Sequence, residues 1–453
     1  MKRGLVLILI LALALSLLTS CELMVPGPTE RPSIGLPGEP AGPGGPAPTE
    51  SADPTVDVYG FTIFPEGNYL ADPRFDTDEF LPDYDFHTSF LGSTTKACST
   101  EDTFYFAYRN SSYYVLNYVD KAINIGGPLC GRPECTHDSK DCNAWLGGVV
   151  WGLTDYNGRL YWVGRDSAGQ SFKIFSSAFD GTDRHTVREL DDSIIGNILN
   201  DSCVLFHRGC LYWSCLTSVV VDGEAIQLAR VFAFPLDASE AGYLILETEY
   251  YGFVSILPHR DSLYIALGGY FEGGVNGERE LADRILSLYR WDIRTREAET
   301  LYRENFPLVT DDYWVAEDGI FFSAVRPAVS AEDSIYLFPF KGGKPELRYH
   351  FPQDVTRYFV FPADGMYVGY NWSAGGLTML VKDFEGQTVL DTFIEGAEWY
   401  DPGGDDMYYM SFAGADEKYY YFKRDNRSYM AYAAVPLDGS EMKLLWSSDA
   451  GAY

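Results

Sequence analysis

Short alternating runs of apolar and polar residues follow tight-turn signals along most of this chain. Asn157-Gly158 precedes the run Arg159–Trp162, and Arg208-Gly209 precedes the similar run Cys210–Trp213. Looser copies of the same pattern begin at Glu101, Asp261, Asp318, Asp364 and Asp416. Asn-Gly and Asp-Gly before an apolar run favour β-hairpins, because these residues tolerate the positive φ of the turn. The pattern therefore predicts a hairpin that recurs about every 50 residues.

A second apolar run and a second turn follow each of these hairpins. Phe172–Phe175 leads to Asp180-Gly181, and the last copy closes with the apolar strand Leu444–Trp446. Four antiparallel strands in a unit of about 50 residues are typical of a β-propeller blade. We expect an all-β chain with a single β-propeller of seven four-stranded blades. Six or eight blades, or a β-sandwich, are the alternatives.

The two faces of such a propeller differ in their connections. If the strands of a blade are lettered A to D from the axis outward, the A–B and C–D turns share one face. The B–C loops and D–A connectors share the other. The second set is long, and includes Thr217–Leu228, Leu267–Arg284 and Ser323–Ser334. Since binding residues concentrate on loops of a rigid scaffold, we expect the ligand on the B–C/D–A face.

Four aromatic residues on that face are candidates for stacking on a ligand. They are Tyr270, Phe271, Tyr370 and Trp372. The alternative is that they only pack the loops. A strand near Tyr59–Phe64, or one near Thr88–Leu91, is expected to complete the last blade and close the ring.

The N-terminus has the pattern of a secretory signal peptide. Lys2 and Arg3 precede Leu5–Leu18, an apolar run shorter than the roughly 20 residues that a membrane-spanning helix needs. The following Leu18–Cys21 resembles the lipobox of bacterial lipoproteins. That resemblance implies that Cys21 carries diacylglycerol and palmitate and that the chain is cut before it. A plain signal peptide is the alternative.

Composition divides the rest of the chain. Residues 22–56 are rich in Pro and Gly and cannot bury a core, so they form an extended tether. We therefore expect a signal peptide at 1–20, a lipidated tether at 21–56 and the propeller at 57–453. The formal net charge of −31 disfavours nucleic acid and anionic membrane surfaces as partners, because both would be repelled.

One connector, between the first and second blades, carries candidate chemistry. Cys130, Cys135, His137 and Cys142 supply three thiols and one imidazole, a donor set that suits zinc. A disulfide in this loop is an equal alternative, and free thiols are a third. The chain has eight Cys, so lipidation of Cys21 would leave an odd number.

A second cysteine group lies on one predicted hairpin. The turn at Arg208-Gly209 places Cys203 nearly opposite Cys215, with Cys210 between them in sequence. A cross-strand disulfide is one interpretation, and small buried residues in a strand are the other.

These features together resemble the propeller lipoproteins of Firmicutes, which share the lipobox, the tether and a Cys-x-x-Pro-x-Cys-x-His loop, here residues 130–137. The repeats are also similar to TolB-like propellers. The resemblance implies a binding or scaffold role outside the cytoplasm, anchored to the cell membrane, and transfers no catalytic residue.

No catalytic motif of a known kind is present. The sequence lacks the GxSxG, HExxH and P-loop patterns. We therefore expect no enzymatic activity, and a binding module for a protein, peptide or glycan ligand. The alternatives are a propeller enzyme acting on carbohydrate or peptide, and an envelope-assembly scaffold.

Overall fold

The computed structural model describes residues 55–64, 76–86, 96–110, 112–165, 171–191, 203–221, 224–238, 240–270, 283–325, 334–352, 357–361, 365–373, 376–395, 409–425 and 430–448. The chain divides into two compact units, Met1–Asp53 and Pro54–Tyr453. The first unit lies outside the described residues, and with it Cys21 and nearly all of the predicted tether. The predicted domain boundaries and lipid anchor therefore stay predictions.

The described strands form seven sheets, each made of four consecutive antiparallel strands, which confirms the seven-bladed β-propeller. The first four blades are built from β1 (Ala97–Ser99), β2 (Thr103–Asn110), β3 (Tyr113–Asp120), β4 (Ile125–Pro128) with the additional β5 (Trp145–Gly147); β6 (Val149–Tyr156), β7 (Arg159–Arg165), β8 (Lys173–Ser177), β9 (His185–Glu189); β10 (Cys203–His207), β11 (Cys210–Val221), β12 (Glu224–Pro235), β13 (Tyr243–Glu249); and β14 (Val254–His259), β15 (Ser262–Gly269), β16 (Ile285–Asp292), β17 (Ala298–Asn305). The last three are built from β18 (Val309–Ala316), β19 (Gly319–Val325), β20 (Ser334–Pro339), β21 (Glu346–His350); β22 (Arg357–Phe361), β23 (Met366–Ser373), β24 (Gly376–Asp383), β25 (Thr388–Glu395); and β26 (Tyr409–Ala415), β27 (Tyr419–Asp425), β28 (Met430–Pro436), β29 (Lys443–Ser447).

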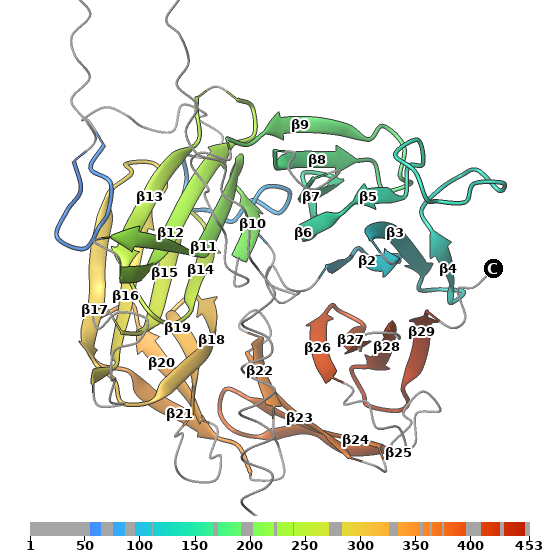
Figure 1. Ribbon diagram of the computed structural model, residues 1–453. Coiled ribbons are helices and arrows are strands. Elements are labelled where there is room, and N and C mark those ends of the chain that lie inside the picture. The colour runs from blue at the N-terminus through green and yellow to red at the C-terminus, as the bar shows by residue number, and fades with distance from the viewer. Residues whose placement is uncertain are drawn as a thin grey trace, which may run out of the picture. The chain divides into compact units, whose positions relative to one another are not determined.

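The blades follow one another around a ring, as Figure 1 shows. Buried apolar clusters join each sheet to the next, and one of them joins the seventh sheet to the first. The first strands of neighbouring sheets contact one another, as β1 and β6 do, and β6 and β10, so the first strand of each sheet is innermost. Alternating apolar residues can face both neighbouring sheets because successive side chains of a strand point to opposite faces.

Tight turns join the first and second strands of a sheet at the predicted positions. Asn157 and Gly158 have φ of 50° and 68°, and Arg208 and Gly209 have φ of 42° and 74°. Two successive residues with positive φ make the two-residue hairpin turn whose twist matches the flanking strands. The repeated turn signal was therefore a sound guide to the A–B hairpins.

Of the two alternatives for ring closure, the strand near Tyr59–Phe64 is wrong. Among the described strands, the seventh sheet is made of four that lie between Tyr409 and Ser447, and none of them is N-terminal. Phe61 instead bridges Leu246 of β13, in the third blade, and Thr88–Leu91 lies outside the described residues. Side chains join the seventh sheet to the first: the rings of Phe104 and Tyr421 stack with centroids 4.7 Å apart.

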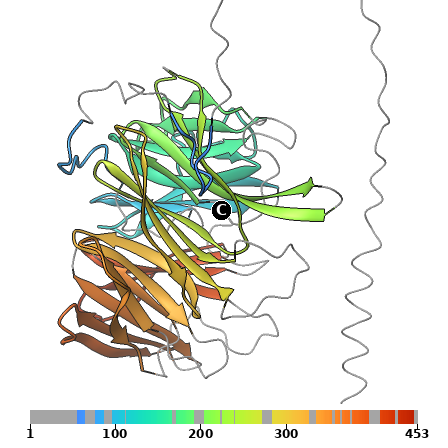
Figure 2. The ribbon, with the colours of Figure 1, turned by 90° about the vertical axis from the view of Figure 1, so that its left-hand side faces the viewer.

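The predicted loop Thr217–Leu228 is also different in the structure. Thr217 pairs with Leu228, and the ladder continues to Val221 opposite Glu224, so β11 and β12 form one long hairpin. Figure 2 shows this hairpin projecting beyond the other strands. The run Val219–Val221 is β-branched and favours strand. All seven B–C connections include residues outside the described ranges, so the prediction of a functional B–C/D–A face stays untested.

Within the described ranges, no helix has the length and apolar character needed to cross a membrane.

Candidate metal centre

The four predicted ligands lie on a loop inserted into the outer strand of the first blade. β4 and β5 both pair with β3, at Asn117–Asp120 and at Tyr114–Val115, so they lie end to end along one edge. Residues 129–144, here called the Cys/His loop, leave the sheet between them. Leu116 closes the base of this loop, because its N–H donates to the Ala144 carbonyl and its carbonyl accepts from the Leu129 N–H.

Two β-turns position the thiols. The Cys135 N–H donates to the Arg132 carbonyl at 3.1 Å, and Pro133 occupies the second turn position, where its fixed φ fits. The Cys142 N–H donates to the Ser139 carbonyl at 3.0 Å in the second turn. The Arg132 guanidinium donates to the Asp141 carbonyl and ties the two limbs of the loop together.

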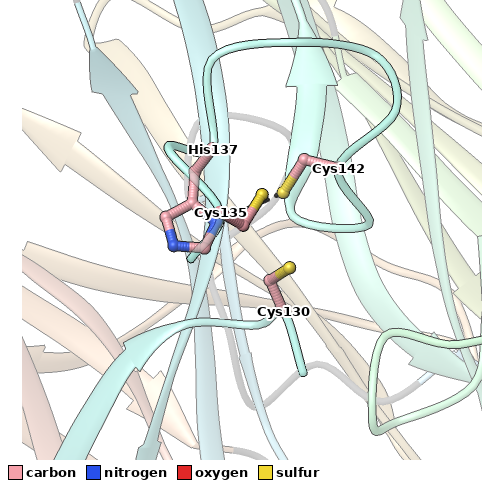
Figure 3. Close-up of side chains that lie close together, drawn as sticks. All are labelled: Cys130, Cys135, His137 and Cys142. Carbon is pink, nitrogen blue, oxygen red and sulfur yellow. Dashed lines mark hydrogen bonds between the residues drawn. The ribbon is translucent and has the colours of Figure 1, made fainter. Parts of the chain in front are cut away.

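The three thiols and the imidazole converge. Their ligand atoms all lie within 4.8 Å of one another, and Nδ1 of His137 is 3.3 Å from Sγ of Cys142. Figure 3 shows the three thiols pointing toward one another with the imidazole beside them. His137 has φ of 58°, in the left-handed region, which non-glycine residues rarely adopt. This turn of the backbone lets two ligands separated by a single residue face the same point.

The cluster of three thiols and one imidazole is partly buried. Cys142 is buried against Val115 and Ala144, while Cys130 and Cys135 are half-buried beside them. Because the other loop residues between 131 and 141 are mostly exposed, the loop has little apolar core of its own.

The thiols differ in their proton affinities. Burial alone would raise the pKa of Cys130, but hydrogen bonds from the Arg132 backbone and from the Cys142 and Cys135 thiols outweigh it, and the pKa is lowered. Burial raises the pKa of Cys142 to about 12, and donation of its proton toward Cys135 adds to the shift. Burial lowers the pKa of His137 despite the nearby Asp138 carboxylate, a shift that favours the neutral imidazole, the form that binds a metal.

The arrangement fits a tetrahedral metal ion. Zinc held by thiolates at about 2.3 Å places sulfurs about 3.8 Å apart, which a small inward movement of these side chains would reach. A disulfide needs two of the sulfurs and gives no reason for the third thiol and the imidazole to converge as well. The Cys/His loop can therefore hold a metal such as zinc.

The hairpin cysteines of the third blade do not converge. Cys203 lies opposite Ser214, one position from the predicted partner Cys215. Because side chains alternate across a strand, Cys203 and Cys210 pack toward the fourth blade and Cys215 toward the second. The cysteines of this hairpin are small residues in the core.

The predicted stacking aromatics are not gathered in one place. Arg284 lies over the ring of Tyr270 in the fourth blade, 5.2 Å from its centroid. In the sixth blade Tyr370 is only 4 % exposed, and its hydroxyl accepts a hydrogen bond from the Phe412 N–H. Trp372 packs edge-on against Phe422. These two rings join the sixth blade to the seventh; Phe271 lies outside the described residues.

Sequence reasoning missed a cavity near the axis. It opens among the A–B turns, has a volume of about 330 Å³, and includes Cys98, Lys121, Asp155 and Asp416 in its lining. An acidic residue lies at or beside nearly every A–B turn of this chain, so no sequence signal singled these out.

Comparison with known proteins gives the following picture. No protein-family model matches the sequence, and no curated protein matches it. Among solved structures, it is similar to an acylaminoacyl peptidase from Pyrococcus horikoshii, with 12 % identity over 80 % of this chain and 54 % of that one, at a TM-score of 0.49. A second is an oligogalacturonate lyase in complex with manganese, with 13 % identity over 77 % of this chain and 90 % of that one, at a TM-score of 0.48.

TolB from Acinetobacter baumannii is a third, with 14 % identity over 77 % of this chain and 78 % of that one, at a TM-score of 0.36. Its presence agrees with the predicted TolB-like propeller, whereas membership of the Firmicutes lipoproteins stays a prediction. The chain spans about half the length of the acylaminoacyl peptidases it matches. At these identities the likeness shows the fold alone.

The expectation that the chain has no enzymatic activity is corrected by these matches. Several of the similar structures are named as peptidases and one as a lyase. The missing motifs were weak grounds for that expectation, because a propeller can serve as one part of an enzyme whose catalytic groups follow no short pattern.

Proposed function

We propose that this protein is a lipid-anchored β-propeller outside the cytoplasm that carries a structural zinc ion in its first blade. We further propose that its ring serves as a binding module for a protein, peptide or glycan. The convergence of Cys130, Cys135, His137 and Cys142 is the observation that carries the metal proposal. The signal-like N-terminus and the resemblance of Leu18–Cys21 to a lipobox support the anchor.

A structural role for the zinc follows from the number of ligands. Three thiolates and one imidazole fill the four positions of tetrahedral zinc and leave none for substrate or water. The ligands would join both limbs of the Cys/His loop above the edge of β3. The exposed loop has few apolar contacts, so the metal would supply much of the free energy that orders it.

The binding role rests on the scaffold. Seven sheets that pack on one another in a ring form the scaffold, and connecting segments on rigid scaffolds are common binding sites. The net charge of −31 favours partners that are not polyanions.

Metal analysis of the full chain tests the zinc proposal. The protein would be purified without oxygen, and its zinc content measured beside its free thiols by intact mass. We expect about one zinc ion per chain, lost in Cys135→Ser and kept in the control Cys98→Ala, whose thiol lies in a different part of the blade. A mass lower by two hydrogen atoms than that of the fully reduced chain, with no zinc, would establish the disulfide instead.

The anchor has its own test. Cys21→Ser should abolish incorporation of labelled fatty acid and release the chain from the membrane fraction. Continued acylation of that variant would overturn the lipobox interpretation without touching the metal proposal.

A further inference from the structure

A cavity near the axis, here called the axial cavity, has the dimensions of a small-ligand site. Its walls come from the innermost strands β1, β6 and β10, together with the turn between β26 and β27. The volume of about 330 Å³ lies near the lower end of the range for ligand pockets, about 300–1,000 Å³. One sugar ring, or a group of similar size, would fit in it.

The accessible walls of the axial cavity are more polar than apolar. Leu153, Val204 and Leu205 belong to the lining, but they are almost fully buried and expose little surface. The hydroxyl-bearing residues of the lining are Ser99, Thr100 and Thr154. Walls of this kind favour a ligand that forms hydrogen bonds, because an apolar ligand would remove the polar groups from water without giving them partners.

Lys121 contributes an ammonium group to the lining, and its side chain is only 6 % exposed. An ammonium has three N–H donors. One donates to the Thr100 carbonyl and one to Oδ2 of Asp416, each at 2.5 Å. The Tyr421 ring lies 5.9 Å from Nζ, near the limit of a cation–π contact. Within the described ranges no further acceptor binds this ammonium, so one N–H can donate to a ligand.

The Asp416 carboxylate, in contrast, is already fully engaged. Its Oδ2 accepts hydrogen bonds from Ser99 at 2.7 Å and Tyr421 at 2.6 Å, as well as from Lys121. Its Oδ1 accepts two backbone N–H groups of the turn that follows. A carboxylate offers about four lone-pair positions, and these five donors occupy them. Asp416 therefore holds Lys121 in place and does not bind a ligand itself.

The rim adds acceptors and a negative charge. Glu101 and Glu417 are exposed, and neither carboxylate forms an ion pair with a described residue. Because Lys121 and Asp416 neutralise each other, the charges that remain in the lining are those of Glu101, Asp155, Glu417 and Lys418. Three carboxylates and one ammonium disfavour an anionic ligand.

An aromatic side chain, Phe86, also lines the axial cavity and is half-buried. The Phe86 N–H donates to Nδ1 of the buried His207 at 2.9 Å. The preceding residue, Asp85, forms an ion pair with the buried Arg208 guanidinium at 2.7 Å. These contacts fix the backbone of Phe86 to the third blade. Its ring is thus held at the cavity, where an aromatic face can pack against the C–H groups of a sugar ring.

We propose that the axial cavity binds one ring of a neutral sugar, as a free monosaccharide or as the end of a glycan. Lys121 donates to a hydroxyl of the ring, the rim carboxylates accept from others, and a C–H face of the ring packs on Phe86. A hydroxyl both donates and accepts, and a compact ring presents several hydroxyls within a volume of this size, whereas a peptide spreads its polar groups along an extended chain. This inference rests on the binding role proposed above and names its ligand class, and it does not depend on zinc in the Cys/His loop.

The methyl glycosides of glucose, galactose, mannose and N-acetylglucosamine, in both anomeric forms, are suitable probes. Binding to the full chain would be measured by ligand-observed nuclear magnetic resonance. We expect at least one to bind with a Kd of about 1–10 mM, as a modest energy per atom implies for a ligand of this size. The corresponding uronic acid should bind at least about fivefold more weakly, because the rim carboxylates repel it.

Two results would overturn the proposal. One is that no glycoside binds, including the case in which the neutral peptide analogue N-acetyl-L-alaninamide binds in their place. The other is that the uronic acid binds more tightly than the neutral sugar.

Oligosaccharides distinguish the two sources of the ring. Tighter binding of a trisaccharide of the same sugar than of its methyl glycoside supports the end of a glycan as the ligand, and equal or weaker binding supports a free monosaccharide.

Variants locate the site. Lys121→Met should weaken binding of the glycoside about tenfold, and Phe86→Leu, which keeps the apolar bulk but removes the aromatic face, about fivefold. The matched controls Lys344→Met and Phe393→Leu change exposed side chains, 76 % and 50 % exposed, on other blades and should leave binding unchanged. Because Lys121 pairs with Asp416, the thermal midpoint of each variant shows whether it folds, and Phe86→Leu tests the site without disturbing that pair.

The outcomes separate this inference from the broader proposals. A glycoside that binds the parent chain and both cavity variants equally would place the sugar outside the axial cavity, which overturns this inference and leaves the binding role standing. A normal zinc content in the same samples would leave the metal proposal intact.

Discussion

Two segments of this chain contain the same side chains in the same span and use them differently. Residues 130–142 hold three Cys and one His, and so do residues 203–215. In the first segment the four ligand atoms lie within 4.8 Å of one another. In the second, the cysteines pack into two different interfaces between blades.

The backbone explains the difference. The hairpin of β10 and β11 is regular, so alternation sends Cys215 to one face and Cys203 and Cys210 to the other. Cys203 and Cys210 share a face, but they lie four ladder positions apart, or about 13 Å at roughly 3.3 Å per residue. The Cys/His loop has two β-turns and a left-handed residue at His137. Convergence of ligands thus needs irregular backbone, and a count of cysteines cannot reveal it.

The histidines of the two segments, His207 and His137, also differ in what their ring nitrogens contact. Nδ1 of His207 accepts a hydrogen bond from the Phe86 N–H at 2.9 Å, and its Nε2–H donates to the Arg260 carbonyl at 2.6 Å. Both nitrogens are therefore engaged with the backbone. His137 instead faces Cys142.

The largest expected contrast is in metal affinity. Cys142→Ser removes a ligand and should weaken zinc binding by a factor of 100 or more, because structural zinc sites derive about 10–16 kcal/mol from their complete ligand set. Cys215→Ser should leave zinc affinity unchanged. Competition with a zinc-binding dye measures both. Equal loss in the two variants would mean that the hairpin cysteines also bind metal.

A second contrast concerns acid stability. Burial lowers the pKa of His207 to about 4, in spite of the opposing Asp85 charge. The unfolded state therefore takes up a proton between about pH 6.5 and 4 that the folded state does not, and stability falls as the pH falls through that window. The loss should reach about 3 kcal/mol. Urea unfolding across that range measures it.

The variant His207→Gln is the control for this prediction. It should be less stable near neutral pH, because two buried hydrogen bonds are disturbed, but its stability should depend less on pH. The same pH dependence in the variant and the parent chain would assign the acid sensitivity to other groups.

The smallest contrast is in packing. Cys210→Ser places a hydroxyl in the buried interface between the third and fourth blades and should destabilise the fold by about 1–3 kcal/mol. Glu134→Gln, on the exposed part of the Cys/His loop, should change stability by less than about 0.5 kcal/mol. Denaturant midpoints for the two variants give both values, and equal midpoints would contradict the burial of Cys210.

Much of the fold could be predicted from sequence because its signals are local. Each A–B turn carries residues that tolerate positive φ, and each strand alternates, so the seven blades could be counted before any coordinates. Ring closure could not, because it depends on contacts such as Phe104 with Tyr421, more than 300 positions apart. The metal cluster was predicted only as one of several alternatives, since the φ of His137 decides whether its ring can face the Cys142 thiol.

The axial cavity illustrates a second limit. Acidic residues lie at or beside most of the A–B turns, yet Asp416 is engaged by Lys121, Ser99 and Tyr421 where the last blade meets the first. The similar turns of the repeats do not show which acidic residue forms an ion pair, because its partner, here Lys121, comes from another blade.

X-ray absorption at the zinc edge, on the full chain purified without oxygen, tests the central proposal most directly. We expect three sulfur ligands at about 2.3 Å and one nitrogen ligand at about 2.0 Å. A first shell with fewer than three sulfurs, or a protein without zinc whose mass shows a disulfide, would contradict a Cys₃His metal centre in the Cys/His loop.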